Sequence, residues 1–299
     1  MELIYTPQQI AGYKGYYHSV RIGNWSEELE LQESRLKDFL YRKEHGELAL
    51  HKAERKLQQH LGPVELSKTE DGRVRFDSVA LLFNHRTESV VATDLNDRTK
   101  AVEEAYSTTT SWYGEPCARN AVTIKKYDSS DDDLVLGIPE SEKDVLHYGQ
   151  KFHIVASSQL RPEADGDLFL RTQAATPLVS SKYSHFQEVS FVHIAHGSKP
   201  RWETVWEVVA ADAEQRVEME GMPVSVETPV LIKHCATGAY LSSDFIAYKN
   251  DFGTEYELSG MTNLDSKKAS FGDRVNAAKN HNVFAFLYAA DTESKEKES

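Results

Sequence analysis

Three histidines lie close enough in the sequence to raise the question of a metal site: His185, His193 and His196. Zinc requires imidazole or thiolate ligands that converge on one point. We expect a strand around His193, and residues i and i+3 of a strand point to opposite faces. The acidic run Asp128–Asp133 has the charge of a calcium loop but lacks the glycine and terminal glutamate of an EF-hand. We therefore predict no metal ion at either place.

Catalytic patterns give no better candidate. The sequence contains no GxSxG, no Walker loop and no GxGxxG after a strand. Cys117 and a histidine could be drawn as a nucleophile and its general base, but two cysteines and 12 histidines permit many such pairs. Trp202 and Trp206 are four apart in an expected strand, so they should share one face, either as core or as a sugar-stacking platform. We predict no catalytic residue, no cofactor and no enzyme activity.

The elements that position these residues are organised around a repeated hairpin. The segment Leu81–Asp94 can be laid on Leu231–Asp244 without a gap, so that Thr87 falls on Thr237 at an offset of 150 residues. Each copy reads as two short apolar strands around a tight turn. An offset of 150 is twice a unit of roughly 75, which predicts a third copy midway.

The middle of the chain contains a candidate for that copy. A strand is expected at Tyr148–Val155 and its returning partner at Asp167–Thr172. Each of the three units ends in an apolar run that closes on aspartate: Ala121–Asp128, Trp202–Asp212 and Asn282–Asp291. Because no unit can bury its own apolar face, the three must pack together, and barrel closure removes free sheet edges. We predict a mainly β fold, a β-trefoil, with a generic β-barrel or sandwich as the alternative.

The composition limits the classes of partner. A net charge of −13 argues against binding nucleic acid or an anionic membrane surface. No apolar run approaches the roughly 18 residues that span a bilayer, and the first residues do not resemble a signal peptide. Two cysteines without CxxC spacing favour free thiols in a reducing compartment. A cytosolic protein, or one attached to a cytosolic structure, is expected.

The chain divides into three predicted parts. Residues 1–62 form an N-terminal arm and helices, with Asn24 as a helix cap and Gly46 as a break. These charged helices should bury one narrow apolar stripe against the barrel or a partner. Residues 63–291 form the trefoil, within which residues 94–120 are interpreted as a polar insertion. Residues 292–299 are expected to be a disordered tail.

Two resemblances add to this interpretation. The runs His147–Gln150 and Leu231–Leu241 look like MIR repeats, a family of β-trefoils found in protein mannosyltransferases and in inositol trisphosphate and ryanodine receptors. A longer similarity, in the same order along nearly the whole chain, resembles the cilia- and flagella-associated protein 161 family. It is carried by Val20–Trp25, Lys37–Leu40, Leu66–Ser67, Thr69–Gly72, His147–Gln150, Glu220–Gly221, Pro223–Val224, Leu231–Ile232, His234–Cys235 and Asn280–His281. Residues 94–120 and the loop around Pro162 depart from that pattern.

The second resemblance implies a non-enzymatic microtubule inner protein. Such a protein sits in the lumen of axonemal doublet microtubules of motile cilia, bound to alpha- and beta-tubulin and to other microtubule inner proteins. The N-terminal arm then supplies the expected contacts, because large aromatic residues and arginine dominate binding energy at interfaces. These contact residues are Arg21 and Trp25, together with Tyr13, Tyr16 and Tyr17. The MIR resemblance leaves a carbohydrate- or peptide-binding module as the alternative.

Overall fold

The computed structural model describes residues 24–99, 105–127, 136–160, 165–261 and 280–289. The chain forms two compact units, Met1–Leu57 and Gln58–Ser299. The first contains helix α2 (Asn24–Glu44) and most of helix α3 (Ala49–Leu61). The two helices predicted around Gly46 are confirmed: this glycine has a φ of 65° between them, a conformation that costs glycine little.

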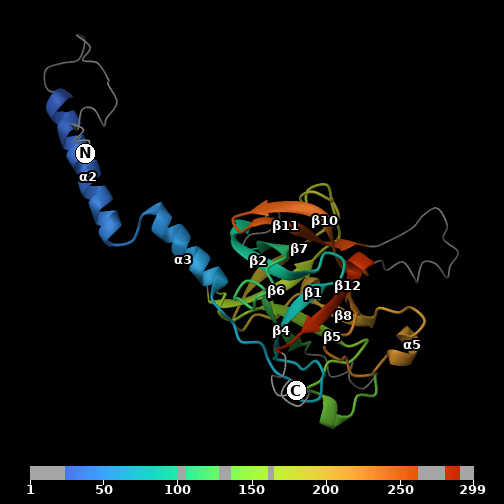
Figure 1. The fold of residues 1–299 in the computed structure, drawn as a ribbon. Helices are drawn as coiled ribbons and strands as arrows, with labels where there is room; N and C mark the ends of the chain where they lie inside the picture. The colour runs from blue at the N-terminus through green and yellow to red at the C-terminus, as the bar shows by residue number, and fades with distance from the viewer. Residues whose placement is uncertain (1–23, 100–104, 128–135, 161–164, 262–279, 290–299) are drawn as a thin grey trace, which may run out of the picture. The chain divides into compact units, whose positions relative to one another are not determined.

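Six short strands of the second unit pair into a closed antiparallel ring (Figure 1). Each strand pairs with one ring neighbour on either side, in the order β1, β4, β5, β8, β9, β12 and back to β1. Their bounds are β1 Val79–Asn84, β4 Ala121–Lys126, β5 Lys151–Ala156, β8 Trp206–Ala210, β9 Val230–His234 and β12 Val283–Leu287. The ring therefore leaves no free edge on any of its six strands.

The other six strands form three hairpins. They are β2 Ser89–Arg98 with β3 Ala105–Ser111, β6 Gly166–Thr172 with β7 Gln187–Ala195, and β10 Tyr240–Asn250 with β11 Gly253–Met261. The second strands of the hairpins also pair with one another: β3 with β7, β7 with β11, and β11 with β3. The three hairpins are thus joined in one sheet. All three predicted repeats are present as strand pairs, including the third copy at β5 and β6.

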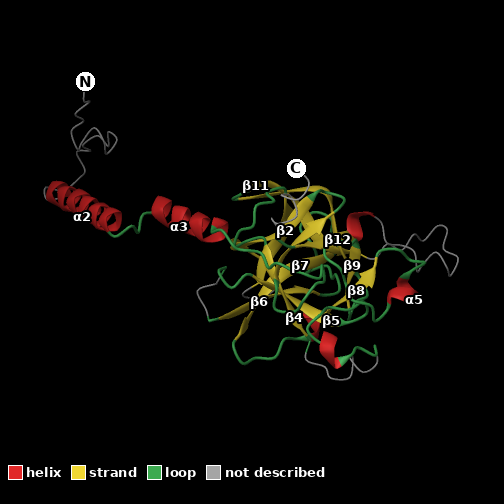
Figure 2. Ribbon diagram, turned by 60° about the horizontal axis from the view of Figure 1, so that its bottom comes forward, coloured by secondary structure: helices red, strands yellow, loops and turns green. Residues whose placement is uncertain are grey.

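Short helical segments occur in the connections between strands (Figure 2). They are α5 Arg216–Met219 and the 3-10 turns η1 Glu140–Glu142, η2 Trp202–Thr204 and η3 Asn280–Asn282. The core of the second unit consists of aliphatic and aromatic side chains from the strands, among which Trp206, Phe152, Phe284 and Phe286 are almost fully buried. Burial of a side chain of this size stabilises the fold by about 1.5–3 kcal/mol.

Three linkers repeat the same structure in front of β1, β5 and β9. Val74, Leu146 and Val224 are fully buried, and antiparallel bridges pair the three linkers with each other: Arg73 with Ser225, Arg75 with Val145 and His147 with Pro223. The equivalence of the linkers is a second, independent sign of a three-fold repeat. The sequence indicated the middle linker through His147–Gln150, whereas Pro223–Val224 of the third linker was noted only as part of the longer resemblance.

A left-handed residue follows each buried linker residue by three positions. Asp77, Gly149 and Glu227 have φ of 57°, 82° and 60°. Their amides donate to the carbonyls of Ile124, Val208 and Phe286 at 2.7, 2.8 and 2.9 Å. Because the contact is made by the backbone, the side chain at this position is free to differ among the repeats.

The interpretation of residues 94–120 as an insertion is wrong. This segment contains the end of β2 and all of β3, so it is part of the first hairpin. All seven residues of β3 are buried although five are serine or threonine. Two of these hydroxyls bond to side chains of other strands: Thr110 to Ser243 and Thr109 to Glu255, each at 2.6 Å.

Candidate functional site

The predicted contact residues of the N-terminal arm fall largely outside the described part of the chain. Arg21, Tyr13, Tyr16 and Tyr17 all precede residue 24. Trp25 lies in the first turn of α2, and its side chain is not among those described. The assignment of these five residues to partner binding therefore stays a prediction.

The prediction that Trp202 and Trp206 share one face is wrong. The chain turns through η2 before β8 begins, so Trp202 is 56% exposed while Trp206 is fully buried and donates from Nε1 to Leu170 O at 2.9 Å. The His234 ring lies near both, with centroids 6.3 Å from Trp202 and 5.2 Å from Trp206. The sugar-stacking platform that these two tryptophans could have formed on a shared face is therefore absent, and the carbohydrate-binding alternative rests on the MIR resemblance alone.

The 150-residue offset corresponds to a shared way of closing the hairpin turn. In the first repeat, Asn84 Oδ1 accepts from Thr87 N and from Thr87 Oγ1, both at 3.0 Å. In the third repeat, His234 Nδ1 accepts from Thr237 N at 3.3 Å, while His234 Nε2 lies 3.1 Å from the Glu203 carbonyl, to which it donates. Burial lowers the pKa of His234, which keeps the ring neutral and suits this pattern. These residues shape the turn.

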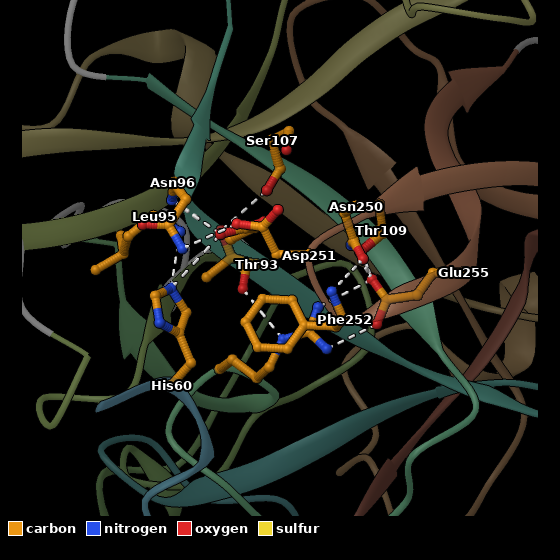
Figure 3. A network of polar contacts seen from close by, with 12 residues as sticks. His60, Thr93, Leu95, Asn96, Ser107, Thr109, Asn250, Asp251, Phe252 and Glu255 are labelled. Carbon is orange, nitrogen blue, oxygen red and sulfur yellow. Dashed lines mark hydrogen bonds and ion pairs between the residues drawn. The ribbon is translucent and has the colours of Figure 1, made fainter. Parts of the chain in front are cut away.

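A polar network centres on a buried ion pair between Arg119 and Glu255 (Figure 3). Arg119 donates from Nη1 and Nη2 to the two carboxylate oxygens at 2.7 and 2.9 Å. Thr109 Oγ1 donates to the same carboxylate at 2.6 Å, and Asn250 Nδ2 also donates to it. The Phe252 ring covers the guanidinium, with its centroid 3.7 Å from Arg119 Cζ.

The ionisation of Glu255 depends on the groups that donate hydrogen bonds to its carboxylate. Burial alone would raise the pKa of Glu255, but the hydrogen bonds and charge of Arg119 outweigh burial and lower that pKa below its ordinary value. The carboxylate is therefore ionised in the fold. Buried charges of this kind are tolerated when paired and fully hydrogen-bonded.

His60, in the last turn of α3, joins the same network. Its Nε2 accepts from Leu95 N at 3.0 Å, and its carbonyl accepts from Arg119 N at 3.0 Å. Asp94 Oδ1 is 3.7 Å from Nε2, and burial raises the pKa of that carboxyl. Because Nε2 accepts a hydrogen bond, the ring carries its proton on Nδ1 in this geometry.

This arrangement holds elements together. It connects the end of α3, strand β2, the β3–β4 connection and the β10–β11 turn through groups that are almost all buried. The ion pair also spans 136 residues of sequence, so no local pattern could have revealed it. We assign the network a structural role: it holds together segments that are distant in the sequence.

Within the described ranges, no three histidine, cysteine, aspartate or glutamate side chains are grouped to hold a metal ion. A hollow of about 150 Å³ beside Tyr148 and Glu220 is smaller than the roughly 300–1,000 Å³ of typical small-molecule sites. Glu207 at its edge is paired with Lys233 at 3.2 Å.

The cysteines match the prediction of free thiols. Neither Cys117 nor Cys235 is in a disulfide, and burial raises the pKa of the Cys117 thiol, which opposes formation of a nucleophilic thiolate. None of the helices in the described ranges combines the length and apolar character needed to cross a membrane.

The closed ring with its three hairpins places the second unit among known mainly β structures. The chain is similar to the SDF2-like protein from Arabidopsis thaliana, with a TM-score of 0.50 and 16% identity over 74% of this chain and 99% of that one. It is also similar to part of the S. cerevisiae protein O-mannosyltransferase Pmt1–Pmt2 complex, with a TM-score of 0.52 and 15% identity over 79% of this chain and 29% of that one. At these identities the likeness concerns the fold.

Sequence comparison defines the family. Residues 70–275 match the model of the cilia- and flagella-associated protein 161-like domain. Cilia- and flagella-associated protein 161 of Danio rerio is 30% identical over 94% of this chain and 91% of its own length, and that of Bos taurus is 30% identical over 89% and 80%. The chain therefore belongs to the cilia- and flagella-associated protein 161 family, as the sequence resemblance indicated.

Proposed function

We propose that this protein is a non-enzymatic structural microtubule inner protein of axonemal doublet microtubules. In this role it binds alpha- and beta-tubulin and neighbouring inner proteins in the doublet lumen and stabilises the doublet in motile cilia. The observation that carries the proposal is membership of a cilia- and flagella-associated family over residues 70–275, which include most of the barrel.

The chemistry of the second unit supports a structural role. Its interior is filled by large apolar side chains, and its main buried ion pair is fully bonded to neighbouring groups. An enzyme active site usually needs a cleft in which titratable groups converge on a substrate. In the described residues the polar clusters instead connect strands and turns.

We further propose that the second unit is a β-trefoil. Support comes from a six-stranded ring, three hairpins paired through β3, β7 and β11, and three equivalent linkers that carry Val74, Leu146 and Val224. A β-trefoil has this three-fold arrangement, and its closed barrel suits a rigid module that holds its place on a larger assembly.

Fractionation of motile cilia tests the proposed function. Detergent should release membrane and matrix proteins, whereas this protein should remain with the axoneme, and it should stay there when salt strips loosely bound surface proteins. An outer dynein subunit serves as the salt-released control. Recovery of this protein in the matrix fraction, with none on the doublets, would refute the proposal.

A further inference from the structure

The second half of α2 has an exposed face on which basic and apolar side chains alternate. Arg35, Phe39 and Lys43 are each four residues apart and form one row along the helix, with Leu36 and Leu40 in the adjacent row. All five are exposed; Leu36, Phe39 and Leu40 are 58%, 49% and 45% accessible. Large apolar residues so exposed, in rows at helical spacing, are typical of a helix that binds in a groove.

The charge of this region is opposite to that of the rest of the chain. Residues 35–56 contain seven lysines and arginines against four aspartates and glutamates, a net of +3. The whole chain has a net charge of −13, which leaves −16 for the remaining residues. A local excess of positive charge in a strongly acidic protein indicates attraction to an acidic partner.

The face differs from a membrane-binding helix in one respect. The first half of α2 contains Glu27, Glu28, Glu30 and Glu33. A helix lying flat on an anionic membrane would bring these carboxylates to the same negative surface as the basic residues, whereas a folded partner can be acidic beneath residues 35–43 alone. The pattern therefore favours a protein surface that offers both acidic groups and an apolar hollow.

We propose that this face of α2 docks on an acidic, apolar-lined surface of tubulin. The proposal rests on the proposed function, which supplies the partner, and it names the residues that make the contact. Phe39 and Leu36 enter the hollow, while Arg35 and Lys43 pair with carboxylates at its rim. The 21 residues of α2 span about 30 Å at 1.5 Å per residue.

The test is a binding titration of the full chain against purified, unpolymerised αβ-tubulin. Arg35→Glu/Lys43→Glu should weaken binding about tenfold or more, because both rim pairs become repulsive. Leu36→Ser/Phe39→Ser should weaken it by at least as much through loss of the buried anchors. Wild-type affinity should fall when salt rises from about 50 to about 200 mM. Circular dichroism confirms that the variants keep their helix.

A matched control carries the same change of charge elsewhere. Lys68→Glu/Lys249→Glu reverses two exposed lysines of the barrel unit and should bind tubulin as the wild type does. If the wild type binds and the α2 variants bind equally well, the docking face is wrong while the proposed function stands. If the wild type fails to bind tubulin at all, the proposed function fails too. Binding to phosphatidylserine vesicles, lost in the charge-reversal variant, with none to tubulin would instead identify a membrane helix.

Discussion

Removing the Glu255 carboxylate should strongly destabilise the barrel unit. Glu255→Leu deletes the acceptor of four hydrogen bonds and leaves the Arg119 guanidinium charged and about 97% buried without its carboxylate partner. Breaking a buried ion pair from one side costs about 3–5 kcal/mol. For a domain of this size the thermal midpoint should fall by about 10 °C.

The double variant Arg119→Met/Glu255→Leu separates two free energies: the net contribution of the ion pair to stability, and the cost of burying an unpaired charge. Replacing both partners by apolar side chains removes the stranded charge, so at least half of the lost stability should return. The exposed pair Arg86–Asp244, at 3.5 Å, provides the control, and Asp244→Ala should change stability by about 0.5 kcal/mol or less.

Urea unfolding measures these differences, with buried Trp206 as the fluorescent reporter. The pKa of Glu255 is lowered in the fold, so its stabilising contribution is present above the ordinary value of 4.5 and is lost as the pH falls through the lowered value. The gap between wild type and Glu255→Leu should therefore narrow in acid. A single variant within about 1 kcal/mol of wild type at neutral pH, or a double variant as unstable as the single one, would refute the reasoning.

Three further predictions concern the barrel unit. Trp206→Ala should cost about 3–5 kcal/mol and exposed Trp202→Ala about 0.5 kcal/mol or less; equal urea midpoints would contradict their assigned positions. Gly166→Ala should cost about 1–3 kcal/mol, because its Cβ would lie 2.4 Å from Ile194 O; an unchanged thermal midpoint would contradict that contact. Burial lowers the pKa of His153 and His234, so unfolding should take up protons and the thermal midpoint should fall as the pH drops below the ordinary 6.5; a midpoint that rises on acidification would contradict this.

The repeats were visible in the sequence where equivalent side chains make the same structural contact. The turns after β1 and β9 use Thr87 and Thr237 at the same position, so the 150-residue offset was visible. The linkers were largely missed because their shared contact is a backbone amide. Asp77, Gly149 and Glu227 therefore have no side-chain chemistry in common.

Other features could not be predicted for different physical reasons. Strand β3 was read as part of a polar insertion because its residues are mainly threonine and serine, and burial of Thr109 and Thr110 depends on hydrogen bonds to the distant residues Glu255 and Ser243. The 3-10 turn that separates Trp202 from Trp206 gives no strong local signal. The Arg119–Glu255 pair depends on closure of the barrel, which brings distant segments together.

A density map of native doublet microtubules from motile cilia tests the central claim most directly. The account predicts barrel density of this chain inside the doublet lumen, with the Arg35, Phe39 and Lys43 row of α2 facing tubulin. In doublets from cilia that lack the protein, this density should be missing, and other luminal densities of the same shape should remain. If the density in the lumen is unchanged without the protein, or if the chain lies outside the doublet, the account is contradicted.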